Sequence, residues 1–316
     1  MISDDRARPG EGTAAQSDAA TDRCGAECGE SRRIDTESGA TEITEFVGAG
    51  SRIFTSLHIP PGDIRGAVVV CSPFQAEFLK NYRREVLLAR RLAAAGWAVQ
   101  RFHYRGTGNS DGESPTLDTM CSDAAAATDH LQQACRPPRL AFVGARFGGL
   151  VATVAANSYP GAALALWEPV TDTRTYLREL FRVRMIRELK DGVTERATAE
   201  GLLETLHAEG TVDIIGFSVD LPFVTAAGER KLGDQLTDAT RPVLLVQCSR
   251  SDRVREPHRK LSEAWENAGA TMTVTTAGDE ETWWFESDVF HTEEDRPLTQ
   301  RLVSITTDWI TGLEQP

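Results

Sequence analysis

The chain has 316 residues, with 34 lysines and arginines against 47 aspartates and glutamates, which gives a formal net charge of −13. A chain this acidic is a poor candidate for binding nucleic acid or an acidic membrane surface through its overall charge. No apolar run approaches the roughly 18 residues that a membrane span needs, and the first residues lack the apolar segment of a secretory signal. Six scattered cysteines do not suggest a disulfide framework, so we interpret them as reduced thiols of a cytoplasmic protein.

The first 42 residues differ in composition from the rest of the chain. They contain no Phe, Trp or Tyr, and they carry ten acidic residues against five arginines. Such a segment cannot bury enough apolar surface to offset the entropy lost on ordering. We therefore expect residues 1–42 to be a disordered acidic tail.

After this tail, apolar runs typical of buried strands alternate with segments of helical spacing. The expected strands are residues 43–47, 52–59, 67–71, 98–103, 140–144, 163–167, 243–248 and 272–276. The expected helices are residues 82–95, 117–134, 149–156, 257–268 and 298–310. This alternation predicts an α/β fold with a mainly parallel eight-stranded sheet and helices on both faces.

Residues 171–235 interrupt the alternation. They follow the sixth expected strand and have the pattern of helices, beginning with residues 176–189. We expect this segment to be a helical cap inserted into a core formed by residues 43–170 and 236–316. The combination resembles the α/β-hydrolase superfamily, a resemblance that implies one catalytic core carrying a cap.

The resemblance is most specific at residues 144–149, which lie between an expected strand and an expected helix. The sequence Gly144-Ala145-Arg146-Phe147-Gly148 has the spacing of the G-x-S-x-G nucleophile elbow of α/β-hydrolases. Residues 72–77 follow the third strand, where this superfamily has its oxyanion loop, and residues 104–112 resemble its D-x-R-G-x-G-x-S turn, with His103 in the acidic position. The order of these segments supports the fold.

The elbow carries Arg146 where these enzymes have serine. A guanidinium cannot act as a nucleophile, so ordinary Ser-His-Asp hydrolysis at this position is excluded. At the start of a helix, Arg146 is placed to bind a substrate carboxylate, phosphate or thioester carbonyl. The alternative is that Arg146 pairs with Asp252 or Glu168 and closes an inactive site.

The remaining catalytic positions follow from the superfamily resemblance. Asp252 comes after the seventh strand, where these enzymes have their catalytic acid, and His291 is the first histidine after the last strand. Asp252, Glu168 or His291 is the expected base. The resemblance also implies an oxyanion hole formed by the backbone N–H groups of Phe74 and Phe147.

One branch of the superfamily matches further motifs. These are Pro73-Phe74-x-x-Glu77, Asn81-x-Arg83-Arg84, the G-x-R-x-G elbow, Trp167-Glu168-Pro169-Val170 and the arginine-rich segment from Tyr176 to Arg182. In these motifs the chain resembles the exosortase-system-associated hydrolase-like proteins. That resemblance implies an elbow without serine and no settled substrate.

Other side chains are candidates for chemistry or for binding. Cys71 and Ser72 end the third strand and are candidates for a displaced nucleophile, although Cys71 also fits a buried core residue. Residues 174–190 carry six basic residues against two glutamates. Arg178 in this segment is a candidate for attracting an anionic substrate, the alternative being that these charges form a solvated helix face. Trp283 and Trp284 are candidates for a pocket wall or a partner contact.

These features favour an enzyme that acts on an ester or thioester-type acyl substrate, by hydrolysis or acyl transfer, without an elbow serine. A small acyl compound linked to a carrier or to coenzyme A is the expected substrate. The rival hypothesis is an inactive hydrolase fold that binds an acyl ligand or a protein. We expect no metal, no cofactor and no nucleic acid partner. The oligomeric state stays open, a dimer being one option.

Overall fold

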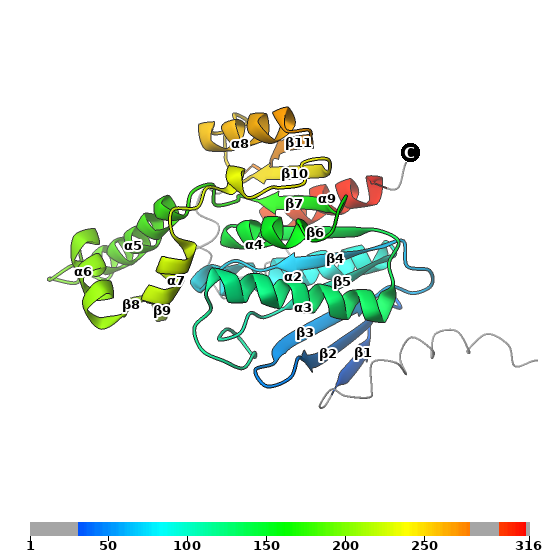
Figure 1. Ribbon diagram of the computed structural model, residues 1–316, viewed down its shortest axis with the longest axis horizontal. Helices are drawn as coiled ribbons and strands as arrows, with labels where there is room; N and C mark the ends of the chain where they lie inside the picture. Colours follow the sequence, from blue (N-terminus) through cyan, green and yellow to red (C-terminus); the bar gives the residue numbers. More distant parts are fainter. Residues whose placement is uncertain (1–30, 279–296, 314–316) are drawn as a thin grey trace, which may run out of the picture.

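The computed structural model describes residues 31–278 and 297–313, and its centre is a nine-stranded sheet (Figure 1). The strand order is β1-β2-β3-β5-β4-β6-β7-β10-β11. The first three strands are antiparallel, β3 is antiparallel to β5, and the strands from β5 to β11 are parallel to one another. The bounds are β1 (Arg32–Asp35), β2 (Thr41–Val47), β3 (Ile53–Ile59), β4 (Gly66–Cys71), β5 (Trp97–Phe102), β6 (Leu140–Ala145), β7 (Ala163–Trp167), β10 (Pro242–Gln247) and β11 (Thr271–Thr276).

The sheet has one strand more than the eight expected, and the additional strand is β1. It lies within residues 1–42, which we expected to be disordered, so that expectation is wrong for Arg32–Asp35. All four residues of β1 are exposed, and the strand is held by backbone pairing with β2. Because it buries no apolar side chain, its sequence carries no strand pattern.

Helices cover both faces of the sheet, as expected for an α/β-hydrolase fold. On one face α2 (Ala76–Ala94) and α9 (Pro297–Gly312) pack together. On the other face lie α3 (Leu117–Cys135), α4 (Phe147–Ala156) and α8 (Glu256–Asn267). Side chains of the parallel strands alternate between the two cores, with Val68 on the α2 side and Val69 on the α3 side, because successive residues of a strand point to opposite faces.

The segment between β7 and β10, called the cap below (residues 171–235), projects from one end of the sheet (Figure 1). It contains α5 (Thr173–Lys190), α6 (Ala199–Glu209) and α7 (Leu221–Ala227). It also contains a hairpin of β8 (Thr211–Ile214) and β9 (Phe217–Asp220). We expected a helical cap, and this hairpin corrects that expectation for residues 211–220. Asp172 caps α5, its carboxylate accepting a hydrogen bond from the backbone N–H of Thr175 at 2.7 Å.

Within the two described ranges, no helix combines the length and the apolar character needed to cross a membrane. The same residues bring together no group of three or more side chains suited to hold a metal ion.

Candidate functional site

The turn between β6 and α4 has the backbone geometry of a nucleophile elbow. Arg146 has φ 52° and ψ −121°, a conformation that residues other than glycine rarely adopt. Two glycines make this turn possible, since a Cβ at Gly144 would collide with the Gly148 carbonyl, and one at Gly148 with the Cys71 and Ser72 carbonyls. The G-x-R-x-G spacing is therefore explained by close contact between α4 and the ends of β4 and β6.

The Arg146 side chain is closed between two carboxylates. Its Nε lies 3.3 Å from Oε1 of Glu77, and its Nη2 lies 2.5 Å from Oε2 of Glu179. The guanidinium also lies over the ring of Tyr176, 5.7 Å from the ring centroid. Only 5% of the side chain is exposed. From the sequence we named Asp252 and Glu168 as its possible partners, and the structure corrects this to Glu77 and Glu179.

Glu77 is the buried member of this group. It lies in the first turn of α2, and its Oε2 accepts a hydrogen bond from the hydroxyl of Tyr176 at 3.1 Å. Burial raises the pKa of Glu77 to about 7, although the Arg146 charge and the Tyr176 hydrogen bond lower it. Arg146, Glu77, Tyr176 and Glu179 are called the Arg146 cluster below.

The guanidinium of Arg146 keeps its positive charge in this cluster. Burial lowers the pKa of Arg146, but the nearby carboxylates of Glu77 and Glu179 outweigh this effect and hold the pKa above its usual range. Burial raises the pKa of Tyr176 well above its ordinary value, so its hydroxyl stays protonated and donates to Glu77. The cluster thus holds a cation beside the carboxyl groups of Glu77 and Glu179, with the Tyr176 hydroxyl donating to Glu77.

Glu168 and Asp252, the two acids that we expected to pair with Arg146, have other surroundings. Glu168, after β7, has a positive φ of 46° and is buried. One of its carboxylate oxygens accepts a hydrogen bond from the backbone N–H of Cys248 at 2.8 Å, and the other pairs with Arg255. Asp252 is exposed in the loop after β10. His291, Trp283 and Trp284 lie outside the described residues.

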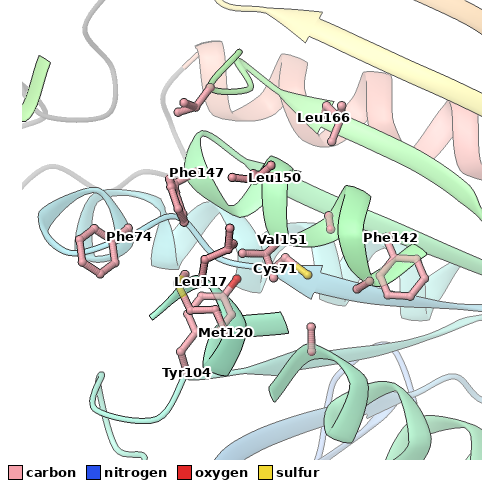
Figure 2. Packing of buried hydrophobic residues seen from close by; sticks show 14 of the residues in the cluster. Cys71, Phe74, Tyr104, Leu117, Met120, Phe142, Phe147, Leu150, Val151 and Leu166 are labelled. Atoms are coloured by element: carbon pink, nitrogen blue, oxygen red, sulfur yellow. The ribbon is translucent and has the colours of Figure 1, made fainter. Parts of the chain in front are cut away.

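The two residues expected to form the oxyanion hole lie at the same end of the sheet. Phe74 lies between β4 and α2, and Phe147 is the first residue of α4. Their buried rings lie 6.1 Å apart between centroids, and Phe223 from the cap stacks on Phe74 at 4.0 Å. Figure 2 shows Phe74 and Phe147 at this edge of the core. The use of their backbone N–H groups stays a prediction.

The environment of Cys71 and Ser72 disfavours a displaced nucleophile. Cys71 is fully buried within the core (Figure 2), and burial raises the pKa of its thiol well above the ordinary value, which suppresses the reactive thiolate. Ser72 is also buried, and its hydroxyl donates to Oε2 of Glu85 at 2.7 Å. Burial also raises the pKa of Glu85, whose other oxygen accepts from Asn81 at 2.9 Å. Both residues are better explained by packing and internal hydrogen bonds.

A cavity of about 630 Å³ lies within the cap and reaches the elbow at Phe147. Its wall is mostly apolar and includes Tyr176, Leu177, Leu180, Phe181, Leu203, Phe223 and Val224. Charged side chains also line it, namely Arg174, Arg178, Glu200 and Glu229. A second, more open space of about 800 Å³ lies at the opposite end of the sheet, where β5 and β6 begin.

The cavity and the Arg146 cluster share a boundary. Tyr176 lines the cavity and donates to Glu77, and its ring stacks on Phe147 at 5.4 Å between centroids. We did not foresee roles for Glu77, Tyr176 and Glu179, although the first two belong to the motifs quoted above. A signal for Glu179 was its position three residues after Tyr176, on the same face of the helix.

Comparison with known proteins supports the family and the fold. The model of the serine aminopeptidase S33 family matches residues 62–276. The structure resembles the esterase Est1E from Butyrivibrio proteoclasticus (15% identity, 84% of this chain and 97% of that chain, TM-score 0.58). It also resembles the proline iminopeptidase of Mycobacterium smegmatis (14% identity, 86% and 98%, TM-score 0.55). At these identities the likeness establishes the fold alone.

The relatives found by sequence match only a short part of the chain. Uncharacterized proteins from two strains of Mycobacterium tuberculosis are 36% identical over 107 residues, which is 33% of this chain and 36% of each relative. The match thus spans about a third of those proteins.

Proposed function

The chain belongs to the serine aminopeptidase S33 family of α/β-hydrolase enzymes, and we propose that within this family it binds an acyl compound without serine-hydrolase turnover. The observation that carries this proposal is Arg146, which occupies the nucleophile position and is closed between Glu77 and Glu179 beside an apolar cavity. The resemblance to exosortase-system-associated proteins is part of this proposal and rests on sequence motifs.

The chemistry of the elbow supports the absence of ordinary hydrolysis. A serine hydrolase needs a nucleophilic oxygen at the elbow and a base that takes its proton. Arg146 supplies neither, and its guanidinium is already paired with Glu77 and Glu179. Cys71 and Ser72 are buried, so neither offers a replacement nucleophile to a substrate in the cavity.

The cavity supports acyl binding. Its volume of about 630 Å³ lies within the range of small-molecule sites, and most of its wall is aromatic or aliphatic. An acyl chain placed there removes apolar surface from water, which stabilises the complex by roughly 25 cal/mol per Å² before the costs of association. Arg178 at the cavity would favour a compound with a negatively charged part, such as a carrier or coenzyme A thioester.

A second candidate is hydrolysis or acyl transfer on an ester or thioester, with Glu77 as general base. The observation that favours it is the pKa of Glu77, which burial raises to about 7, the range in which a carboxylate exchanges protons most usefully at neutral pH. Tyr176 connects Glu77 to the cavity wall. In this case Arg146 would stabilise a carbonyl oxygen.

One experiment separates the two candidates. Calorimetric titration with dodecan-1-ol measures occupancy of the cavity, and release of nitrophenol from nitrophenyl dodecanoate measures turnover. We expect the wild type to bind the alcohol and to release no nitrophenol above background. Leu177→Trp fills the cavity and should weaken binding at least about tenfold. Leu189→Trp, on an exposed position of the same helix, is the matched control and should bind like the wild type.

Two outcomes contradict the proposal. Failure of dodecan-1-ol to bind the wild type, or equal binding by Leu177→Trp, removes the acyl-binding function. Turnover by the wild type that is lost in Glu77→Gln establishes the second candidate instead.

A further inference from the structure

The two carboxylates that pair with Arg146 differ in how they are held. Glu77 belongs to the core, is buried, and has a second hydrogen bond from Tyr176. Glu179 belongs to α5 of the cap, and 45% of its side chain is exposed. A buried carboxylate that loses its cation pays a large desolvation cost, whereas a half-exposed one is taken up by water. Glu179 is therefore the exchangeable partner.

We propose that Glu179 occupies the position of a ligand carboxylate, so that Arg146 receives the head group of a fatty-acid-like compound whose chain lies in the cap cavity. This inference rests on the proposed function and specifies its ligand. In the free protein, Glu179 acts as an internal competitor, and it moves into solvent when the ligand carboxylate replaces it at the guanidinium.

The cavity reaches the Arg146 cluster at Tyr176. Phe147, which follows Arg146 in the chain, lines the cavity, and so does Tyr176, whose ring lies under the guanidinium. These two stacked rings form the wall between the cavity and Arg146. Arg146 and Glu179 do not line the cavity themselves, so the ligand carboxylate reaches the guanidinium when Glu179 leaves it and the Tyr176 ring moves aside with α5.

The chemistry of the exchange favours a carboxylate over a neutral group. Glu179 and the ligand both offer two oxygens to a planar guanidinium, so one charge-assisted contact replaces another. An alcohol or ester oxygen gives only a neutral acceptor and cannot compete with Glu179 on these terms. Because Glu179 is tethered to α5, it is present at a high effective concentration and lowers the apparent affinity of every carboxylate ligand.

The test compares two amphiphiles with the same chain, dodecanoate and dodecan-1-ol, by calorimetric titration at one pH. In Glu179→Gln the internal competitor loses its charge while its size is kept. We expect this variant to bind dodecanoate about tenfold or more tightly than the wild type does, with the affinity for dodecan-1-ol unchanged. Glu204→Gln is the matched control, because Glu204 is an exposed glutamate of α6 that does not line the cavity, so the variant removes one negative charge from the cap away from the binding site. It should leave both affinities near the wild-type values.

Two results would overturn the inference while leaving the proposed function in place. One is equal dodecanoate affinity in the wild type and in Glu179→Gln, with dodecan-1-ol bound by both. The other is an equal gain in Glu204→Gln, which would assign the effect to general electrostatics. If neither amphiphile binds the wild type or any variant, the proposed function fails and this inference fails with it. Circular dichroism and urea unfolding of each variant verify that it is folded.

Discussion

At the scale of single residues, Glu77 combines a buried position with a partly neutralised charge. Only 4% of the residue is exposed, and its two oxygens contact Arg146 and Tyr176. Burial is the largest effect on its pKa and raises it from 4.5 to about 7, despite the opposing effect of Arg146. The folded protein therefore binds a proton at Glu77 in a pH range where the unfolded chain has released it.

This shift predicts a pH-dependent stability. Between pH 4.5 and about 7 the folded state holds more protons at Glu77 than the unfolded state does, so the contribution of Glu77 to the free energy of unfolding falls as the pH rises. The full loss is on the order of 3 kcal/mol, since one pKa unit corresponds to about 1.36 kcal/mol. Urea unfolding across this range measures it. Glu77→Gln should lose this part of the slope.

The control for the pH experiment is Glu263→Gln. Glu263 is an exposed glutamate on α8 that pairs with Arg259, so the variant makes the same chemical change on the surface. It should keep the wild-type dependence on pH. An equal slope in the wild type and in Glu77→Gln would show that Glu77 titrates as an ordinary carboxyl.

The position of a site residue was predictable where a motif fixes the backbone. Its contacts were less predictable where they depend on the direction of the side chain. The elbow spacing placed Arg146 correctly, because two glycines in contact with other backbone groups leave this turn little freedom. The rule that catalytic residues follow strand ends placed Glu168 at the correct edge. It did not reveal that the backbone of Glu168 turns at positive φ, so that its carboxylate binds the Cys248 N–H and Arg255 instead of Arg146.

At the scale of elements, the approach of α4 to β4 depends on Gly148. A Cβ at this position would overlap the backbone carbonyls of Cys71 and Ser72, which belong to the end of β4 and its following loop. Neither carbonyl can move without shifting the strand end. The contact brings the start of α4, and with it Arg146, against the edge of the sheet.

Gly148→Ala should therefore destabilise the fold by about 2 kcal/mol or more, because added volume in a close-packed contact forces a backbone shift. Gly312→Ala is the matched control, since Gly312 also lies in a helix and a Cβ there meets nothing within 4 Å. The control should be neutral or more stable by up to roughly 1 kcal/mol, because alanine favours helix. Urea unfolding measures both. Equal effects in the two variants would contradict the packing argument.

Elements that bury apolar runs were predictable, and short elements on the surface were not. The fully buried strand β4 is a continuous apolar sequence, and the prediction of residues 67–71 falls within it. The hairpin of β8 and β9 has only four residues in each strand, too few to establish a period. Its turn carries Ile215 and Gly216 at positive φ, and isoleucine there gives no signal of a hairpin turn.

The basic character of α5 also depends on more than its own sequence. Six basic residues suggested a positively charged face, but Arg184 pairs with Glu188 and Arg187 with Asp191 along the helix, and Arg174 pairs with Glu229 of the following segment. Arg178 remains exposed at the cavity. Partners four residues away were visible in the sequence, whereas Glu229 required the fold. The attraction for anions is thus more local than the charge count of the helix implies.

At the scale of the whole molecule, several contacts between the cap and the core lie near the elbow, in addition to those that the end of the cap makes with α4 and α8. Phe223 of α7 stacks on Phe74 at 4.0 Å and lies 5.1 Å from Phe147, between ring centroids. Tyr176 and Glu179 of α5 contact Glu77 and Arg146. These residues therefore help to hold the cap on the core, and Tyr176, Phe147 and Phe223 among them also line the cavity.

Loss of the Phe223 ring should loosen the cap more than the sheet. Phe223→Ala removes an aromatic ring that is buried against two core rings, a change that costs about 3–5 kcal/mol where the surroundings cannot collapse. Because these contacts join the cap to the core, we expect hydrogen exchange to accelerate at least about tenfold in α5 and α7, and much less in β4 and β6.

Phe46→Ala is the control, since Phe46 packs on Phe54 in the antiparallel part of the sheet. It should accelerate exchange near β2 and β3 and leave the cap unchanged. Equal acceleration of cap and sheet in Phe223→Ala would mean that the two unfold as one cooperative unit, so that no ligand could enter by local opening of the cap.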